Sequence, residues 1–162
     1  MSNPPYPPRQ LHYDGKPQVA TAGYTFPSID PSDESLIAHI HAASESDVDA
    51  AVNAAEKAFL SWSQTPPVIR ARILHRAARL LRQRNDEIAR AETRDTGKPF
   101  SETSVVDVVT GADVLEYFAN LVGSGGLNGE TAQLREGVWM YTKKAPLGVC
   151  AGIGAWNYPI QM

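Results

Sequence analysis

Apolar residues recur at helical spacing through the middle of the chain. From Ser46 onward they follow alternating steps of four and three residues, which predicts a helix with one face turned to a core. The residues of that face are Val48, Val52, Ala55, Phe59 and Trp62. Ser46 and Asp49 have the spacing of a capping box, in which side chains satisfy the free N–H groups of the first turn. We therefore expect this helix to begin at Ser46.

A second amphipathic helix follows a start signal at Thr65, where Pro66 has the fixed φ angle that suits the first helical position. Its apolar side carries Ile69, Ile73, Ala77 and Leu80, and its remaining surface carries Arg70, Arg72, Arg76, Arg79, Arg82 and Arg84. Acidic residues follow directly and no aromatic side chains are interleaved. We therefore expect these arginines to form a solvated, salt-bridged face or a subunit contact.

The helical pattern continues beyond this face with two interruptions. It bends near Asn85 and then ends at Gly97-Lys98-Pro99, because glycine and proline both oppose continuation. A third long helix is predicted from near Ser101 to the glycines of VGSGG. Its apolar side carries Val105, Val108, Ala112, Leu115 and Ala119. The glycines and Asn128-Gly129 predict a connection rich in turns.

Shorter apolar stretches at both ends of the chain predict strands. Residues 11–41 are divided by Asp14-Gly15, Pro27 and Asp30-Pro31, which predicts a small meander of strands and turns. VWMYTKK alternates bulky and polar residues as an edge strand does, and LGVCAGI is typical of a buried strand of a parallel sheet. The predicted fold class is therefore α/β.

Composition and charge indicate the size class of the protein and exclude some kinds of partner. A chain of 162 residues, 43% of them hydrophobic and 20% charged, has the size of one globular domain with a usable core. The net charge of −3 gives no general attraction to nucleic acid or anionic lipid, so we expect neither nucleic acid nor a membrane as a partner. Residues 1–10, MSNPPYPPRQ, lack the apolar core of a signal peptide and are expected to be a loose extension.

The single cysteine, Cys150, rules out an internal disulfide framework and fits a reducing compartment, so we expect a cytoplasmic location. We expect Cys150 to be a core residue, because it lies in the apolar stretch and no histidine follows it that could act beside it. His39 and His41 share one face of a predicted strand, but two ligands without a third do not indicate a metal site.

The stretch from Gly152 to Asn157, GIGAWN, approaches the dinucleotide-binding motif G-x-G-x-x-G, but its third glycine is missing. Two interpretations stay open for it: a phosphate-binding turn, or an ordinary turn with small residues for packing. Two interpretations are also open for Asn157. A carboxamide just after the end of a strand can donate to an oxygen that becomes negative during carbonyl chemistry, whereas asparagine before Pro159 is equally typical of a helix cap.

At LGVCAGIGAWNYPIQ the chain resembles the NAD-dependent aldehyde dehydrogenase superfamily. There, P-x-G-V-x-x-x-I-x-x-W-N-x-P marks the first strand of the coenzyme domain and the loop of the catalytic asparagine. Ile29-Asp30-Pro31, AAEKAFLSWS, IRARILHRAARLLRQRNDEIARAETRDTGKP and SETSVVDVVTGADVLEYFANL are similar to the betaine aldehyde dehydrogenase branch. The resemblance covers residues 24–162.

The resemblance implies the N-terminal part of the aldehyde dehydrogenase fold, with a small strand meander, several helices and the start of a Rossmann-like coenzyme domain. Residues 11–145 would form the strands, helices and edge strand, and residues 146–162 the first strand and the catalytic-asparagine loop of the coenzyme domain. The chain would correspond to the N-terminal third of such an enzyme, without the nucleophilic cysteine and the glutamate base, so we expect no activity from it alone.

For the complete enzyme the resemblance implies oxidation of betaine aldehyde, or a similar amino or trimethylammonium aldehyde, to the acid. A thiolate attacks the aldehyde carbon, a hydride passes to NAD or NADP, and water releases the acid. The implied roles are oxyanion binding for Asn157, coenzyme contact for Ile153, Gly154, Ala155 and Trp156, substrate contact for Tyr158, and potassium binding for Ser28, Ile29 and Asp95.

The resemblance also implies a homo-oligomer for the full-length form. Two alternatives remain beside the enzyme: a non-catalytic interaction module that keeps part of the fold, and a nucleotide-binding module that uses only the GxGxxN loop.

Overall fold

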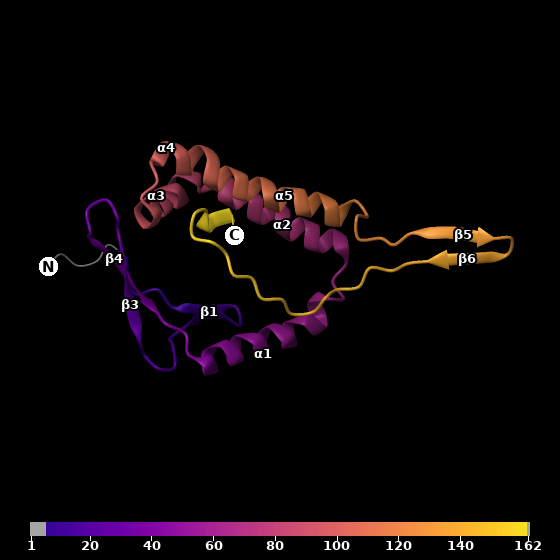
Figure 1. The fold of residues 1–162 in the computed structure, drawn as a ribbon, viewed down its shortest axis with the longest axis horizontal. Coiled ribbons are helices and arrows are strands. Elements are labelled where there is room, and N and C mark those ends of the chain that lie inside the picture. Colours follow the sequence, from indigo (N-terminus) through magenta and orange to yellow (C-terminus); the bar gives the residue numbers. More distant parts are fainter. Residues whose placement is uncertain (1–5, 162) are drawn as a thin grey trace.

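The computed structural model describes residues 6–161 (Figure 1). Its elements are, in order, β1 (Leu11–Tyr13), β2 (Lys16–Gln18), β3 (Thr25–Ile29), β4 (Leu36–His41), α1 (Glu45–Trp62), α2 (Pro67–Gln83), α3 (Asn85–Thr96), α4 (Phe100–Glu102), the π-helical turn η1 (Thr103–Asp107), α5 (Val108–Gly123), β5 (Thr131–Arg135), β6 (Val138–Tyr141) and the 3₁₀ turn η2 (Pro159–Gln161). The strands form three separate antiparallel pairs, β1–β2, β3–β4 and β5–β6. Helices α2 and α5 lie side by side, and the β5–β6 hairpin extends away from them.

The N-terminal strands form two hairpins, as the meander prediction requires. Asp14 and Gly15 make the turn between β1 and β2 with φ angles of 55° and 72°, which a tight two-residue hairpin turn needs. Pro27, however, lies within β3 opposite His39, so the prediction that it separates strands is wrong. The only strand paired with β3 in residues 6–161 is β4, and a strand at a sheet edge tolerates a proline because its missing N–H can face away from the partner.

Arg9 is tied to β4 and is not part of a loose extension. Its backbone N–H donates to the carbonyl of His39 at 2.8 Å, and the N–H of His41 donates to the carbonyl of Arg9 at 2.9 Å. The free edge of β4 supplies these backbone partners, so the expectation of a loose tail is wrong at Arg9. The part of that expectation that concerns residues 1–5 lies outside the described residues.

Helix α1 begins at Glu45, one residue before the predicted start at Ser46. Its N-cap is Ser44, whose backbone N–H and hydroxyl donate to the Asp47 carboxylate at 2.9 Å and 2.7 Å. The hydroxyl of Thr21 donates to the same carboxylate at 2.6 Å, which joins the meander to the helix. The hydroxyls of Thr21 and Ser44 hold the pKa of Asp47 far below its ordinary value.

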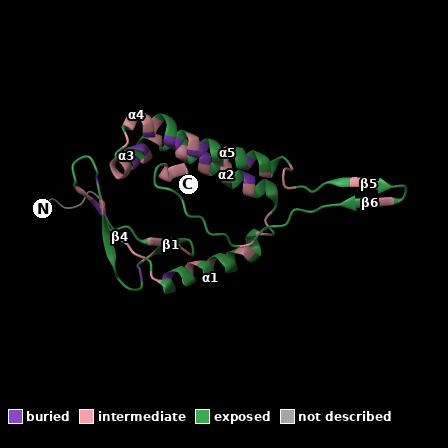
Figure 2. Ribbon diagram, in the orientation of Figure 1, coloured by how far each residue is buried: buried purple, intermediate pink, exposed green. Residues whose placement is uncertain are grey.

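Most of the buried residues lie where α2, α3, η1 and α5 meet (Figure 2). Most of them are small, which lets these helices approach closely. They include Ala71, Ala78, Ala89, Val108, Ala112 and Ala119. Val108, Ala112 and Ala119 confirm part of the apolar side predicted for the third helix, but Val105 is exposed, because one π-helical turn rotates the residues before α5 out of register with it.

The apolar sides predicted for the first two helices are largely exposed. In α1, Val48, Val52 and Trp62 are exposed, and in α2, Ile73 and Leu80 are exposed. Within residues 6–161 the main neighbour of α1 is β1, and α2 packs against α5 with Ala71 and Ala78 as its buried residues. An apolar face is buried only where another element packs on it, so the burial prediction is wrong for these faces.

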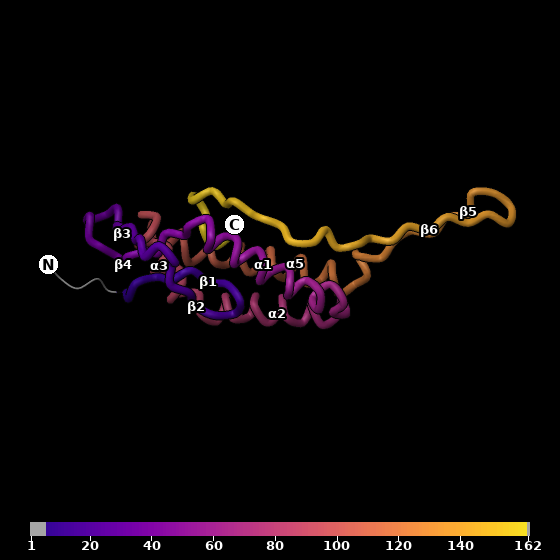
Figure 3. The backbone as a smooth tube through the Cα atoms, turned by 90° about the horizontal axis from the view of Figure 1, so that it is seen from below, coloured from indigo at the N-terminus to yellow at the C-terminus, as the bar shows by residue number. Residues whose placement is uncertain are grey.

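Residues 146–157 form no strand. They run as an extended segment from the β5–β6 hairpin back to the end of the helix pair where α3 lies (Figures 1 and 3). Leu147, Ile153 and Cys150 are exposed, so the prediction of a buried strand with a core cysteine is wrong in this structure. The reason is that no described strand lies beside the segment to take its backbone hydrogen bonds.

The edge strand predicted from VWMYTKK is confirmed as β6, and its partner β5 has no counterpart in the sequence prediction. The salt-bridged arginine face is confirmed at Arg82, which pairs with Asp113 and Glu116 of α5 at 2.7 Å and 2.6 Å. None of the helices in the part of the chain that the structure describes is long and apolar enough to cross a membrane.

Candidate functional site

The last described residues pack against the helix pair at the end where α3 lies. A Cβ atom added to Gly111 of α5 would lie 3.1 Å from the carbonyl oxygen of Ile160, so η2 approaches the helix closely because position 111 has no side chain. This contact brings the residues that precede η2, Trp156 to Tyr158, next to the end of α3.

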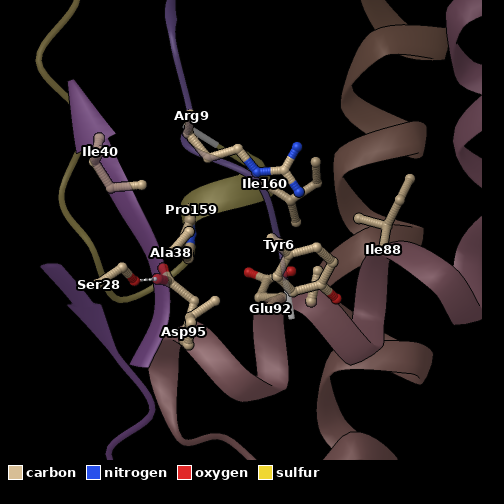
Figure 4. Close-up of a pocket in the computed structure, with 12 residues that line it drawn as sticks. Tyr6, Arg9, Ser28, Ala38, Ile40, Ile88, Glu92, Asp95, Pro159 and Ile160 are labelled. Carbon is tan, nitrogen blue, oxygen red and sulfur yellow. Dashed lines mark hydrogen bonds between the residues drawn. The ribbon is translucent and has the colours of Figure 1, made fainter. Parts of the chain in front are cut away.

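Asp95 joins three segments that are far apart in the sequence. Its Oδ1 accepts a hydrogen bond from the hydroxyl of Ser28 in β3 at 2.9 Å, and its Oδ2 accepts one from the indole N–H of Trp156 at 2.9 Å. Figure 4 shows the bond between Ser28 and Asp95 beside Pro159. The structure thus brings together three of the predicted site residues, and Ile29 follows Ser28 in β3 with an exposed side chain.

Lys98 lies against the ring of Tyr158, with its Nζ 3.3 Å from the ring centroid. The same Nζ donates to Oδ2 of Asp107 at 2.8 Å, and Asp107 is completely buried. Burial alone would lower the pKa of Lys98, but the hydrogen bond and the charge of Asp107 raise it above its ordinary value. A positive charge is therefore held on one face of the predicted substrate-binding ring.

A cavity of about 340 Å³ lies between the β3–β4 hairpin, α3 and η2 (Figure 4). Apolar side chains of Ile37, Ala38, Ile40, Ile88, Pro159 and Ile160 form much of its wall. Its polar lining includes Glu92 and Asp95. Burial, with a further effect from Asp107, raises the pKa of Glu92 above its ordinary value.

Lys98, Asp107 and Glu92 have no role in the sequence prediction. For Asp107 a signal exists, since it is a charged residue inside the apolar run VVDVV of a predicted helix, and a charge in such a place is normally paired. Nothing in the pattern around Lys98 indicates that it faces Tyr158, because the two residues are far apart along the chain.

Asn157 lies in an exposed turn between Trp156 and η2. The N–H of Gln161 donates to the carbonyl of Tyr158 at 3.1 Å, so the turn opens at Tyr158 and Asn157 precedes it. The two neighbours of Asn157 are each held by a charged residue near the end of α3, Trp156 by Asp95 and Tyr158 by Lys98. Asn157 is therefore an exposed residue whose two neighbours in the chain are both anchored.

The backbone of residues 151–155, before this turn, is exposed to solvent. Among the described residues, none of their N–H or C=O groups takes part in a backbone hydrogen bond. A Cβ atom on Gly152 would meet nothing within 4 Å. Free backbone groups and small side chains are what a dinucleotide needs for close approach, so these residues fit such a ligand. Among residues 6–161, no cluster of three or more histidine, cysteine, aspartate or glutamate side chains could hold a metal ion.

Comparison with known proteins gives a single consistent result. The sequence profile of the aldehyde dehydrogenase family matches residues 19–162. The chain is similar to the solved aldehyde dehydrogenase KauB from Pseudomonas aeruginosa, with a TM-score of 0.89 and 31% identity over 95% of this chain and 31% of that one. It is also similar to PnpE from Pseudomonas sp. WBC-3, with a TM-score of 0.88 and 35% identity over 94% of this chain and 31% of that one.

A third similar structure is the indole-3-acetaldehyde dehydrogenase AldA of P. syringae, solved in complex with NAD+. It has a TM-score of 0.87 and 34% identity over 93% of this chain and 30% of that one. The chain therefore spans about a third of the length of the solved structures that it matches.

Proposed function

The chain belongs to the aldehyde dehydrogenase family and has the fold of its N-terminal part, and on this basis we propose that it contributes to the oxidation of an aldehyde to a carboxylic acid with NAD as the acceptor. NADP is the alternative acceptor. The observation that carries the proposal is the exposed position of Asn157 between two anchored aromatic residues, next to exposed backbone groups that fit a dinucleotide. Residues 11–145 would support this site, and residues 146–162 would begin the coenzyme domain.

In this proposal Asn157 donates a hydrogen bond from its side-chain N–H₂ to the aldehyde oxygen. That oxygen gains negative charge when a nucleophile adds to the carbonyl carbon, so the bond is stronger in the transition state than in the bound substrate. Such a donor works best when its position is set before the reaction. The contacts of Trp156 and Tyr158 with Asp95 and Lys98 support that requirement.

The open stretch before Asn157 is the proposed contact with the coenzyme. NAD, when bound, accepts a hydride from the substrate carbon. Gly154 and Ala155 have no bulky side chain to hold a ligand away from the backbone. Ile153 and Trp156 are exposed and offer apolar surface on either side of them.

We propose an aldehyde with an amino or trimethylammonium group, such as betaine aldehyde, as the substrate. The electron-rich face of Tyr158 attracts cations, and it already contacts the ammonium group of Lys98. Asp107 pairs with Lys98 at 2.8 Å, which offsets the positive charge of the lysine beside the ring.

Ser28, Ile29 and Asp95 remain our proposal for a potassium site, in which backbone carbonyls would supply part of the ligand set. Support comes from the 2.9 Å hydrogen bond between Ser28 and Asp95, which places these two residues together.

For the complete enzyme we also propose a homo-oligomer in the cytoplasm. The exposed apolar side chains of Leu134, Trp139 and Met140, on a hairpin that extends from the helices, support a protein partner there.

The direct test of the function is the formation of NADH by a full-length enzyme that contains this segment. We expect NADH to form when betaine aldehyde is added and none to form without an aldehyde. Amino aldehydes and indole-3-acetaldehyde serve as comparison substrates. Absence of NADH with all of them would contradict the proposal and favour a non-catalytic interaction module or a nucleotide-binding module.

Replacing Tyr158 with alanine should raise the KM for betaine aldehyde by about 2- to 30-fold, which corresponds to the roughly 0.5–2 kcal/mol of a cation–ring contact. The KM for the uncharged analogue, with a tert-butyl group in place of the trimethylammonium group, should change less. Tyr158→Phe keeps the ring and should keep the KM. An equal rise of KM for both aldehydes in Tyr158→Ala would show that the ring contributes only packing.

A further inference from the structure

We propose that Asp95 is a positioning residue that determines where Asn157 presents its carboxamide. The proposal rests on the proposed function, because it concerns the hydrogen bond from Asn157 to the aldehyde oxygen. Asp95 acts through Trp156, the residue directly before Asn157, whose indole N–H donates to Oδ2 of Asp95 at 2.9 Å.

The segment that carries Asn157 has few other anchors. Residues 151–157 are exposed, and no backbone hydrogen bond joins them to the rest of the described residues. Trp156 is itself 69% exposed, so packing holds its side chain only weakly. The hydrogen bond to Asp95 therefore restrains a loop that backbone hydrogen bonds and burial leave free.

Asp95 is well placed to restrain that loop because its own position is fixed. It lies in the last turn of α3, which ends where Gly97 takes a left-handed conformation with φ 77° and donates its N–H to Thr93 at 2.9 Å. The hydroxyl of Ser28 in β3 donates to its other carboxylate oxygen at 2.9 Å. One oxygen thus orients the carboxylate against β3, and the other is left to accept from Trp156 in a charge-assisted hydrogen bond.

The decisive comparison is Asp95→Ala with Asp95→Asn in a full-length enzyme that contains this segment. Alanine removes both hydrogen bonds. Asparagine keeps them, because its side-chain oxygen can accept from the indole of Trp156 while its NH₂ donates to the hydroxyl oxygen of Ser28. We expect Asp95→Ala to lower the single-turnover rate of NADH formation by up to about 100-fold, the loss that a small misplacement of a reacting group causes. The KM for NAD should change less, and Asp95→Asn should restore most of the rate.

A second measurement detects the hydrogen bond between Trp156 and Asp95 and does not depend on enzyme activity. In the full-length enzyme, ¹⁵N labelling of tryptophan gives one indole N–H resonance for each tryptophan, and Trp156→Phe identifies that of Trp156. In Asp95→Ala we expect this resonance to move and its hydrogen to exchange faster with solvent, while those of Trp62 and Trp139 stay in place. In Asp95→Asn the resonance should remain near its original position.

The outcomes separate the positioning role from the proposed function. An Asp95→Ala enzyme that keeps both its rate and its Trp156 resonance would overturn the positioning role, and so would a resonance that moves while the rate per folded enzyme stays unchanged. An unsubstituted enzyme that forms no NADH would overturn the proposed function, and the positioning role with it. If Asp95→Ala does not fold, Trp156→Phe removes the donor from the other side of the same bond, and an unchanged rate in that variant would overturn the proposal.

Discussion

Asn157→Ala, in a full-length enzyme that contains this segment, should slow the chemical steps by about 10²- to 10³-fold, or roughly 2.7–4 kcal/mol of transition-state stabilisation. The side-chain N–H₂ contributes most when the aldehyde oxygen becomes negative, so binding of the substrate should change less than the rate. Single-turnover formation of NADH measures this effect directly, because it is not limited by product release.

Asn157→Asp is the matched control for the oxyanion role. The two side chains have the same size, but a carboxylate would place a second negative charge beside the forming oxyanion, so this variant should be as slow as the alanine variant or slower. If Asn157 only caps the turn at η2, aspartate should serve as well as asparagine, and alanine should cost about 1 kcal/mol of folding stability with normal turnover of the folded enzyme. A near-normal rate in Asn157→Asp would therefore exclude the oxyanion role.

Lys98→Met should lower the free energy of unfolding by about 3 kcal/mol, the lower end of the range for breaking a buried ion pair. Asp107 has no exposed surface and would lose the ammonium group that lies 2.8 Å from its carboxylate. The lower end of the range applies because the side chain of Lys98 is 18% exposed, so water can partly replace its ammonium group. Denaturant unfolding of the enzyme and the variant measures the difference.

A double variant separates the lost charge pair from lost packing. Lys98→Met combined with Asp107→Leu removes both charges and should recover much of the stability, because no charge is then left unpaired in the core. If the double variant is no more stable than Lys98→Met, packing of the lysine chain rather than its charge explains the loss.

The pH dependence gives an independent check of the same pair. The pKa of Lys98 is raised in the folded protein above its ordinary value of 10.5. A group with a raised pKa contributes stability that is fully present below its unfolded pKa and is lost as the pH rises through the folded one. The difference in stability between the enzyme and Lys98→Met should therefore be constant at neutral pH and should shrink only in strongly alkaline solution.

Features that depend on a few neighbouring residues could be predicted from the sequence. The turn at Asp14-Gly15 and the end of α3 at Gly97 appear where their residues predict them, and α2 begins at Pro67, one residue after the predicted start. Glycine in a left-handed conformation, proline at a helix start and a two-residue hairpin turn are local effects, because each follows from the φ angles and hydrogen bonds of adjacent residues. The family resemblance could be found in the motif around Asn157 for the same reason, since the motif is one continuous stretch.

Which apolar faces are buried and which side chains meet depends on how the elements pack together. The pattern in α1 marks Val48 as apolar but does not say whether another element covers it, and in this structure none of the described helices does. LGVCAGI is apolar enough for a buried strand, yet a strand needs a neighbour to take its backbone hydrogen bonds, and no described strand supplies one. The bond from Trp156 to Asp95 spans 61 residues, so no local pattern encodes it, and it exists because the packing of η2 on α5 brings the two segments together.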